Sequence, residues 1–285
     1  MRSVRRQDDV TLPPGEPVLD AAPLAGRWIN TNSASNGIAE LLVEVSGNLA
    51  VLKPASRRDG DWRVWGEAPI GRLHGGDIRA TAAAAFTAEI TVGTCDIVLQ
   101  GNVNLGLLVL ASFNRRHNDA GPVVADYFGR EFYRRADLAG AIAGPLWRTG
   151  DAPVGADDAR QPDAPPPTMP FDRRDLVGDW RNTNPNSAGI ARMVIEADGD
   201  GLRLDVAGVG HDAPIAWPRL AAGPFALDSG SAKAKAFSAR LATDGIILDL
   251  QANIKQGVLV VASFTSFNDG SGRAGYFHRE FYFRD

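Results

Sequence analysis

The chain carries the same polar stretch twice, and this repeat constrains its fold more than any other feature. GRWINTNSASNGIA occupies residues 26–39, and GDWRNTNPNSAGIA occupies residues 178–191. The Gly, Trp, Asn, Thr, Asn, Ser, Gly, Ile and Ala residues stand at the same places in both copies, as do Glu44 and Glu196. Agreement over so many side chains is not expected by chance, so it indicates an internal duplication.

The similarity continues to the end of each copy. LQGNVNLGLLVLASF (99–113) matches LQANIKQGVLVVASF (250–264), and YFGREFYRR (127–135) matches YFHREFYFR (276–284). Each copy has roughly the length of a whole domain, which favours two domains over a solenoid. We assign residues 1–22 to a flexible N-terminal arm, which could also lie across the other copy, 23–136 to repeat 1, 137–172 to a short helix and linker, and 173–285 to repeat 2.

The pattern inside each copy is typical of strands. IARMVIEADGDGLRLDVAGV (190–209) alternates apolar and polar residues around a turn signal, and FSARLATDGIILDLQANI (237–254) does so again. A meander of this length can remove its edges by closing on itself. The sequence therefore predicts an all-β chain of two tandem antiparallel up-and-down β-barrels, joined by a linker rich in Pro, Ala and Asp.

Each copy opens with Gly-x-Trp-x-Asn, as Gly26-Arg27-Trp28 and Gly178-Asp179-Trp180 show, and ends in an aromatic strand that contains arginine. This pattern resembles the calycin superfamily of lipocalin and avidin-like barrels. The resemblance implies a ligand pocket at one mouth, a packed Trp (Trp28, Trp180), and a last-strand arginine over it (Arg130, Arg279). The tryptophan array of a biotin pocket is missing, so biotin binding is not predicted.

Asparagines follow the tryptophan in each copy. Strand alternation places Asn30 and Asn32 on the face of Trp28, and Asn182 and Asn184 on the face of Trp180. If the tryptophans point inward, these amides could bind a ligand, with Ser35 and Ser187 as hydroxyls at the rim. The alternative is that these side chains bind the backbone of their own turns.

Two further strands carry opposite patterns. Gln100 and Asn102 share one face, as do Gln251 and Asn253, which predicts either a solvated outer face or the polar wall of a ligand pocket. The following strands, LLVLASF and VLVVASF, are apolar on both faces. We expect them to pack against the sister barrel within the chain or against a second copy in a homo-oligomer.

The last strand places a charge on each face. With Arg279 among phenylalanines on one face, Glu280 shares the other with Tyr276 and Tyr282. The calycin resemblance favours an inward arginine and an outward Tyr-Glu-Tyr face. The rival interpretation makes Glu131 and Glu280 acids of a pocket, beside Tyr127 and Tyr276, that could transfer protons.

Composition excludes several function classes. A net charge of -4 and a pI near 5.6 argue against a nucleic-acid partner, and no apolar run is long enough to span a membrane. The N-terminus lacks the apolar core of a signal peptide, which predicts a cytoplasmic protein. The single Cys95 excludes a disulfide within the chain, and His74 and His211 are expected at the surface, so we predict neither a metal site nor a cofactor.

These observations lead to a binding function. We expect non-covalent binding of a small, partly apolar molecule in the mouth of one or both barrels. Two alternatives stay open: a cofactor-independent cyclase or isomerase that acts on a polyene or polyketide-like substrate in a fitted cavity, and a bivalent lectin-like or assembly module. A cavity that keeps Glu and Tyr in one copy and is plugged in the other would favour the enzyme.

Overall fold

Strands make up almost all of the regular structure. The computed structural model describes residues 4–15, 17–47, 49–116, 125–136, 171–228 and 230–285. Two short 3-10 helices, η1 (Arg6–Asp8) and η2 (Ala22–Leu24), precede the first strand. The linker and most of the expected short helix lie outside the described residues. The all-β prediction is confirmed.

The first half closes into an eight-stranded antiparallel barrel. Strand β1 pairs with both β2 and β9, and the pairing runs through β3, β5, β6, β7 and β8 between them, while β4 is a short hairpin partner of β3. The strands are β1 (Gly26–Asn30), β2 (Ile38–Ser46), β3 (Leu49–Arg58), β4 (Asp61–Val64), β5 (Ala68–His74), β6 (Ala85–Val92), β7 (Cys95–Asn104), β8 (Leu107–Arg116) and β9 (Tyr127–Arg135).

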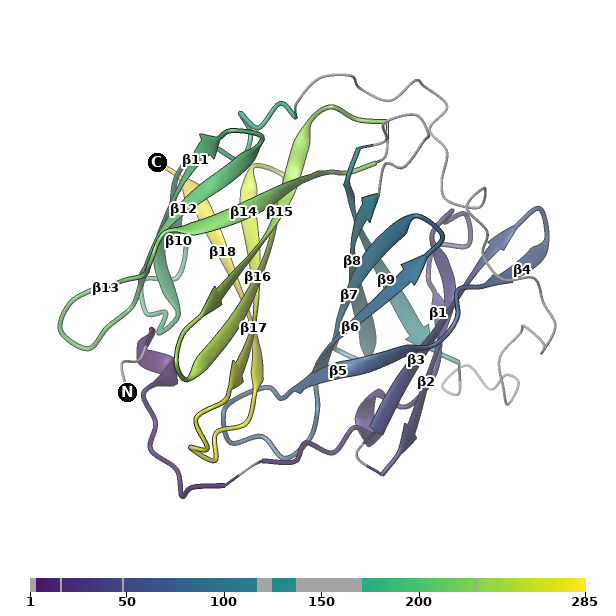
Figure 1. The fold of residues 1–285 in the computed structure, drawn as a ribbon, viewed down its shortest axis with the longest axis horizontal. Coiled ribbons are helices and arrows are strands. Elements are labelled where there is room, and N and C mark those ends of the chain that lie inside the picture. Colours follow the sequence, from purple (N-terminus) through teal and green to yellow (C-terminus); the bar gives the residue numbers. More distant parts are fainter. Residues whose placement is uncertain (1–3, 16, 48, 117–124, 137–170, 229) are drawn as a thin grey trace.

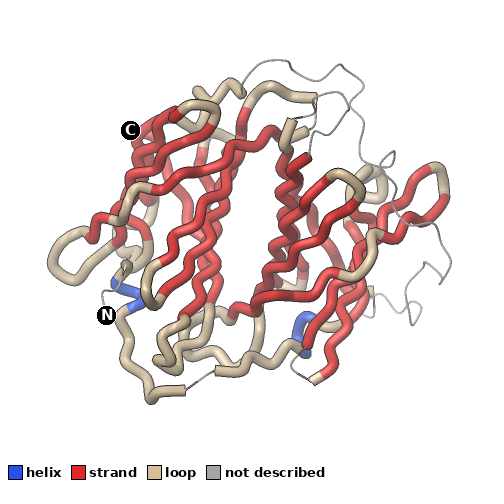
Figure 2. Tube along the Cα trace, in the orientation of Figure 1, coloured by secondary structure: helices blue, strands red, loops and turns tan. Residues whose placement is uncertain are grey.

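The second half repeats this order of pairings. Strand β10 pairs with both β11 and β18, as β1 does with β2 and β9. A parallel bridge between Tyr127 and Ala226 connects the strands of both halves, which lie side by side (Figures 1 and 2). The strands are β10 (Gly178–Asn182), β11 (Ile190–Asp198), β12 (Gly201–Gly208), β13 (Ile215–Ala216), β14 (Leu220–Ala226), β15 (Ala234–Ala242), β16 (Ile246–Lys255), β17 (Val258–Phe267) and β18 (Tyr276–Arg284).

A tryptophan lies in the apolar core of each half. Trp28 and Trp180 are each 1% exposed, and their indole N–H groups donate to the carbonyls of Leu24 and Leu176 at 2.9 and 2.8 Å. Burial of the ring with its N–H satisfied is the arrangement expected for a packed tryptophan. The packed Trp of the expected barrel is therefore present in both halves.

The arginines over these tryptophans are not the expected ones. The Cζ atoms of Arg135 and Arg284 lie 5.3 and 4.7 Å from the ring centres of Trp28 and Trp180. Arg130 and Arg279 lie instead over Phe128 and Phe277, on the outward face of β9 and β18. The strand register is the reason. Trp28 pairs with Arg135 and Trp180 pairs with Arg284, so the last arginine of each strand reaches the indole ring.

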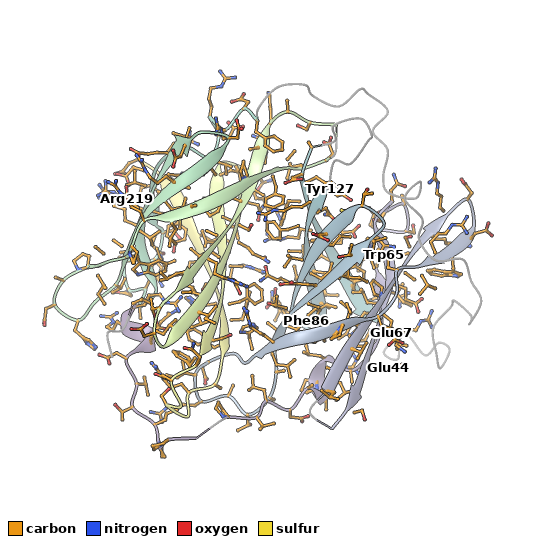
Figure 3. All side chains as sticks on the ribbon, in the orientation of Figure 1. Glu44, Trp65, Glu67, Phe86, Tyr127 and Arg219 are labelled. Atoms are coloured by element: carbon orange, nitrogen blue, oxygen red, sulfur yellow. The ribbon has the colours of Figure 1, made fainter. Side chains whose placement is uncertain are left out.

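The two halves meet through apolar and charged contacts. Phe113 of β8 packs with Phe225 of the second half, at a ring-centre distance of 4.9 Å, and Phe264 of β17 clusters with Ala85 of the first. Figure 3 draws side chains from both halves in the space between their ribbons. Arg72 donates to Asp249 across the same boundary at 2.6 Å. The strands with two apolar faces are thus those that lie between the halves.

His74 is buried at this boundary rather than exposed, which corrects the expected surface position. Its Nδ1 lies 3.1 Å from the carbonyl oxygen of Thr265, and its ring meets Phe264 edge-on. A carbonyl can only accept, so Nδ1 carries the proton. Burial lowers the pKa of His74 to about 4.

This depressed pKa predicts an acid-sensitive boundary. Because the unfolded chain binds a proton at His74 below pH 6.5 and the folded chain does not until about pH 4, stability falls as pH falls through this window. His74→Gln should reduce the slope of unfolding free energy against pH by about 1.4 kcal/mol per pH unit there. Urea unfolding at several pH values measures the slope, with the exposed His211→Gln as control. An unchanged slope in His74→Gln would contradict the assignment.

Candidate functional site

The inward face of the last strand carries the acid in both halves. Tyr276, Glu280 and Tyr282 are 4%, 8% and 0% exposed, whereas Phe281 and Phe283 are 47% and 45% exposed. This corrects the expected orientation, in which the Tyr-Glu-Tyr face pointed outward. The rival placement, with Glu131 and Glu280 inside, is the one observed.

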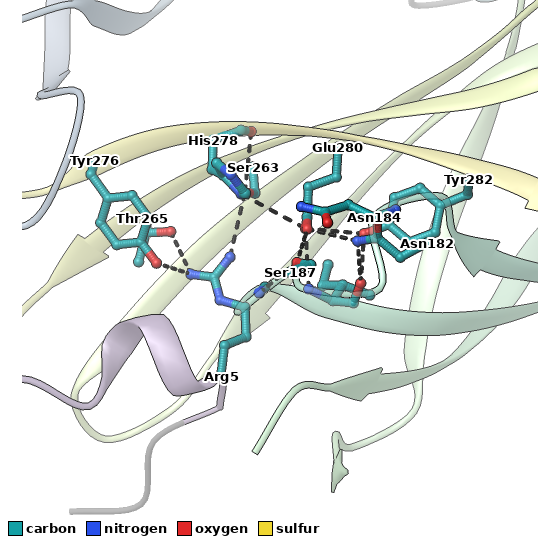
Figure 4. Close-up of polar contacts among 12 residues, drawn as sticks. Arg5, Asn182, Asn184, Ser187, Ser263, Thr265, Tyr276, His278, Glu280 and Tyr282 are labelled. Atoms are coloured by element: carbon teal, nitrogen blue, oxygen red, sulfur yellow. Dashed lines mark hydrogen bonds and ion pairs between the residues drawn. The ribbon is translucent and has the colours of Figure 1, made fainter. Parts of the chain in front are cut away.

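Hydrogen bonds from the repeated stretch compensate the burial of Glu280. Its Oε1 accepts from Asn182 Nδ2 at 2.7 Å and from the hydroxyl of Ser187. Its Oε2 accepts from the backbone N–H of Ile190 and from the hydroxyl of Tyr282, both at 3.1 Å (Figure 4). A buried carboxylate is tolerated when its lone pairs are satisfied in this way.

Glu131 has a smaller set of the same partners. The hydroxyl of Ser35 donates to Oε1, and the hydroxyl of Tyr133 donates to Oε2 at 3.0 Å. Asn30 directs its amide to the carbonyl of Ile38, at 2.8 Å. Burial and the neighbouring carboxylates raise the pKa of Tyr133 and Tyr282, so both hydroxyls remain protonated donors.

The remaining asparagine groups stabilise their own turns. Oδ1 of Asn30 accepts from the N–H of Asn32, and Oδ1 of Asn32 from that of Ala34. The second copy repeats this pattern, with Asn182 accepting from Asn184 at 2.9 Å and Asn184 accepting from Asn186 at 3.0 Å. The repeated stretch therefore builds a turn whose other side chains hold the glutamate of the last strand.

A glycine in each turn permits the glutamate to approach. A Cβ atom at Gly189 would lie 2.4 Å from Oε2 of Glu280, and one at Gly37 would lie 2.9 Å from Oε2 of Glu131. The carboxylate thus occupies the space that any other residue's side chain would need.

The polar face of β7 and β16 lies at the boundary between the halves. Gln100, Asn102, Gln251 and Asn253 are all at most 6% exposed. Asn102 accepts from Arg279 at 2.7 Å, and Gln100 donates to Thr87 at 3.3 Å. The other half covers this face, so it is not a solvated outer face. Two of its residues lie beside hollows, Gln100 in a cleft between the halves and Asn253 next to a cavity of the first half.

In the second half, the N-terminal arm fills the place next to Glu280. We define the Arg5 cluster as Arg5, Asp8, Ser263, Thr265 and Tyr276. Figure 4 shows Arg5 with Ser263, Thr265 and Tyr276. Arg5 is 0% exposed and forms a bidentate pair with Asp8, with both N···O distances 2.9 Å. It also donates to Thr265 and Tyr276, each at 2.8 Å, and to Ser263 at 3.4 Å.

The surroundings of Arg5 stabilise its charge. Burial alone disfavours the charged guanidinium, but Tyr276, Asp8 and Glu280 together raise the pKa of Arg5. The arm is also fixed by its backbone, since the carbonyl of Val4 accepts from Trp217 Nε1 at 2.8 Å and Arg6 donates to Val209. These residues of the expected flexible arm are therefore built into the second half.

The corresponding place in the first half is a cavity of about 550 Å³, which we call the first-half cavity. Glu131, Ser35 and Tyr127 line it together with apolar side chains, and Asn253 of the second half lies at its margin. Its further lining includes Asn32, Ile38, Ser56, Trp65, Val92, Cys95, Ile97, Leu110, Ser112, Asn114, Gly129 and Arg130. This volume and mixture of walls are typical of a small-molecule site.

One substitution between the copies opens this space. Gly129 stands where the second half has His278, whose ring lies near Glu280 at 3.8 Å. Burial lowers the pKa of His278.

Three residues of these two places, Arg5, Asp8 and Gly129, were not predicted from the sequence. The available signals were the Arg-Arg-Gln-Asp-Asp segment of the arm and the glycine within an otherwise matching strand.

A larger cleft of about 900 Å³ lies between the halves. Most of its charged side chains already have partners: Arg240 donates to Asp249, Thr91 donates to Asp96, and Arg115 lies over the ring of Phe225 at 5.3 Å and near Asp126. The acids of the two last strands do not line it. We therefore take the first-half cavity as the candidate site.

The described residues contain neither a cluster of metal ligands nor a membrane-spanning helix. Within the described ranges, no three His, Cys, Asp or Glu side chains gather as metal ligands would. In the same residues, no helix has the length and apolar character needed to cross a membrane. No protein-family model, curated protein or solved structure matches the chain.

The glycine of the repeated turn gives a direct test of the glutamate's role. Gly189→Ala should lower the free energy of unfolding by about 1–3 kcal/mol, because its Cβ would displace Glu280 from its hydrogen bonds. Gly76→Ala is the matched control, since nothing lies within 4 Å of its Cβ. Equal stabilities of the two variants, measured by chemical denaturation, would show that the carboxylate does not need this space.

Proposed function

We propose that the chain is a tandem pair of calycin-like barrels in which the first binds a small, partly apolar molecule and the second is closed by the N-terminal arm. One observation carries the proposal. The place next to the inward glutamate is filled by Arg5 in the second half and is a cavity of about 550 Å³ in the first. A lining that mixes polar and apolar side chains suits a partly apolar ligand.

The difference between the halves also favours the alternative of a cofactor-independent cyclase or isomerase. In the first-half cavity, Glu131 lies within hydrogen-bond distance of Ser35 and Tyr133, and Tyr127 is part of the wall. An acid in a shaped, partly apolar cavity can transfer a proton to a bound substrate. Catalysis would require the same bound molecule, so binding is the common first step.

A bivalent lectin-like module has less support. That alternative needs free amides at two equivalent rims, yet Asn30, Asn32, Asn182 and Asn184 all accept hydrogen bonds from their own turns. A cytoplasmic location stays a prediction from the sequence.

Native mass spectrometry tests the binding proposal. Protein purified from its own host should carry a small molecule that is lost on mild organic extraction. Gly129→His, which places the second half's residue in the cavity, should abolish this extra mass because the imidazole fills the space. A Cβ atom at Gly129 would lie 2.8 Å from the hydroxyl oxygen of Ser112, and the second half accommodates the same pair of residues as Ser263 and His278.

The control is Gly76→His, at an exposed glycine with nothing within 4 Å. If Gly129→His retained the molecule while Gly76→His behaved like the wild type, the ligand would lie elsewhere and the cavity assignment would be wrong. Turnover of the released molecule on re-addition to the extracted protein would favour the enzyme over a binding protein.

A further inference from the structure

We infer that the first-half cavity binds the guanidinium head of a small molecule, with an apolar stem along the cavity wall. The inference rests on the proposed function, because it names the class of ligand for the same cavity. The second half is the model for this ligand, because there the guanidinium of Arg5 occupies the position that corresponds to the first-half cavity.

The second half displays how this place holds a guanidinium. Arg5 donates to Ser263, Thr265 and Tyr276, whose side chains all point from β17 and β18 toward the arm (Figure 4). The two halves align so that these residues correspond to Ser112, Asn114 and Tyr127. All three corresponding residues line the first-half cavity, and each carries an oxygen that can accept a hydrogen bond.

The oxygen of Asn114 is available for such a bond. Its Nδ2 donates to the Ser112 carbonyl and hydroxyl and to the Tyr127 carbonyl, at 3.1 to 3.4 Å, which fixes the direction of the amide. Among the described residues, nothing donates to its Oδ1. Asn114 therefore offers an acceptor where Thr265 accepts from Arg5.

Glu131 supplies the charge that a cation requires. Glu280 accepts four hydrogen bonds, but Glu131 accepts only those of Ser35 and Tyr133 within the described part of the chain. A carboxylate offers about four acceptor positions, so two remain. No cation of the described residues pairs with Glu131. In the second half Asp8 arrives with the arm to balance Arg5, and here Glu131 takes that role.

The wall of the cavity fits the rest of such a ligand. In the second half the imidazole of His278 lies next to Glu280, but the first half has Gly129 at this position. A head group in the first-half cavity can therefore reach the carboxylate of Glu131. Trp65, Ile97 and Leu110 line the cavity with apolar surface. Two cations also belong to the lining, Arg130, which lies over the ring of Phe128, and Lys255 of the second half. A planar cation on an apolar stem would satisfy the acceptors around Glu131 and the apolar part of the wall.

Matched probes test the inference on the full chain. n-Butylguanidinium and n-butylurea have the same shape, but only the first is charged. Isothermal titration calorimetry on extracted protein should give binding of n-butylguanidinium about ten-fold tighter or more than that of n-butylurea, because of the charge-assisted bonds to Glu131. Glu131→Gln should remove this preference. Glu44→Gln, an exposed acid of the same half, should retain it.

The second half provides a check that does not depend on the folding of Glu131→Gln. Arg5→Ala leaves the acceptors of the Arg5 cluster without their donor and should lower the Tm. Millimolar methylguanidinium should raise the Tm of Arg5→Ala more than methylurea does, and more than it raises that of the wild type. Failure of this rescue would overturn the use of Arg5 as a template.

The outcomes separate the two proposals. Equal binding of both probes, abolished by Gly129→His, would overturn the guanidinium head and leave the binding cavity supported. Binding of neither probe would also overturn the guanidinium head. The proposed function would then be decided by whether native mass spectrometry finds a co-purified molecule that Gly129→His loses. A preference for n-butylguanidinium that Glu131→Gln does not change would place the cation elsewhere and overturn the role of Glu131.

Discussion

The contact between the first-strand turn and the buried glutamate of the last strand is the interaction on which the rest of the structure depends. In the second half, Asn182, Ser187 and the backbone of Ile190 all donate to Glu280. The turn belongs to the start of the half and the glutamate to its end, so these bonds join the strands β10 and β18 that close the ring of pairings. Burial of the carboxylate without these donors would cost too much free energy, and the Tyr-Glu-Tyr face of the last strand would then not be stable on the inside.

This interaction is present in both halves, so the difference between them lies in what occupies the space next to the glutamate. With the glutamate held in place, each half has a polar end inside, and the occupant of that end is decided by residues outside the repeated stretch. In the second half the arm delivers Arg5 together with its own counter-charge, Asp8. In the first half Gly129 leaves space beside Glu131, and the cavity results. The same turn thus lies next to a cavity in the first half and next to the buried Arg5 in the second.

The boundary between the halves combines apolar packing with a small number of buried polar groups. Phe113 and Phe225 pack across it, while Arg72 and Asp249 form an ion pair and His74 bonds to the backbone of Thr265. Arg130 has a pKa lowered to about 10 by burial and by Arg279 nearby. Such groups tolerate only a narrow range of relative positions, because each unpaired polar atom would cost free energy. The boundary therefore fixes how the halves sit together.

The sequence predicted the strands well because their signals are local. Alternation, turn residues and the position of Trp28 and Trp180 all act within a few residues, and the repeat confirmed each signal by supplying it twice. The sequence also named Glu131 and Glu280 as acids of a rival interpretation, since an acid between tyrosines is visible in one strand. Alternation could not decide which face was inside, because Arg279 marks one face and Glu280 the other, and either burial would cost free energy.

What the sequence by itself determined is the class of fold, the two matching halves and the residues that share each face. The tertiary structure decided which faces are inside and which end is filled. Glu280 faces inward because its donors come from residues about ninety positions earlier in the chain, and Arg5 reaches its partners across more than 250 positions. Contacts of this range depend on the closed ring and on the packing of the halves, which bring residues distant in sequence to within hydrogen-bond distance.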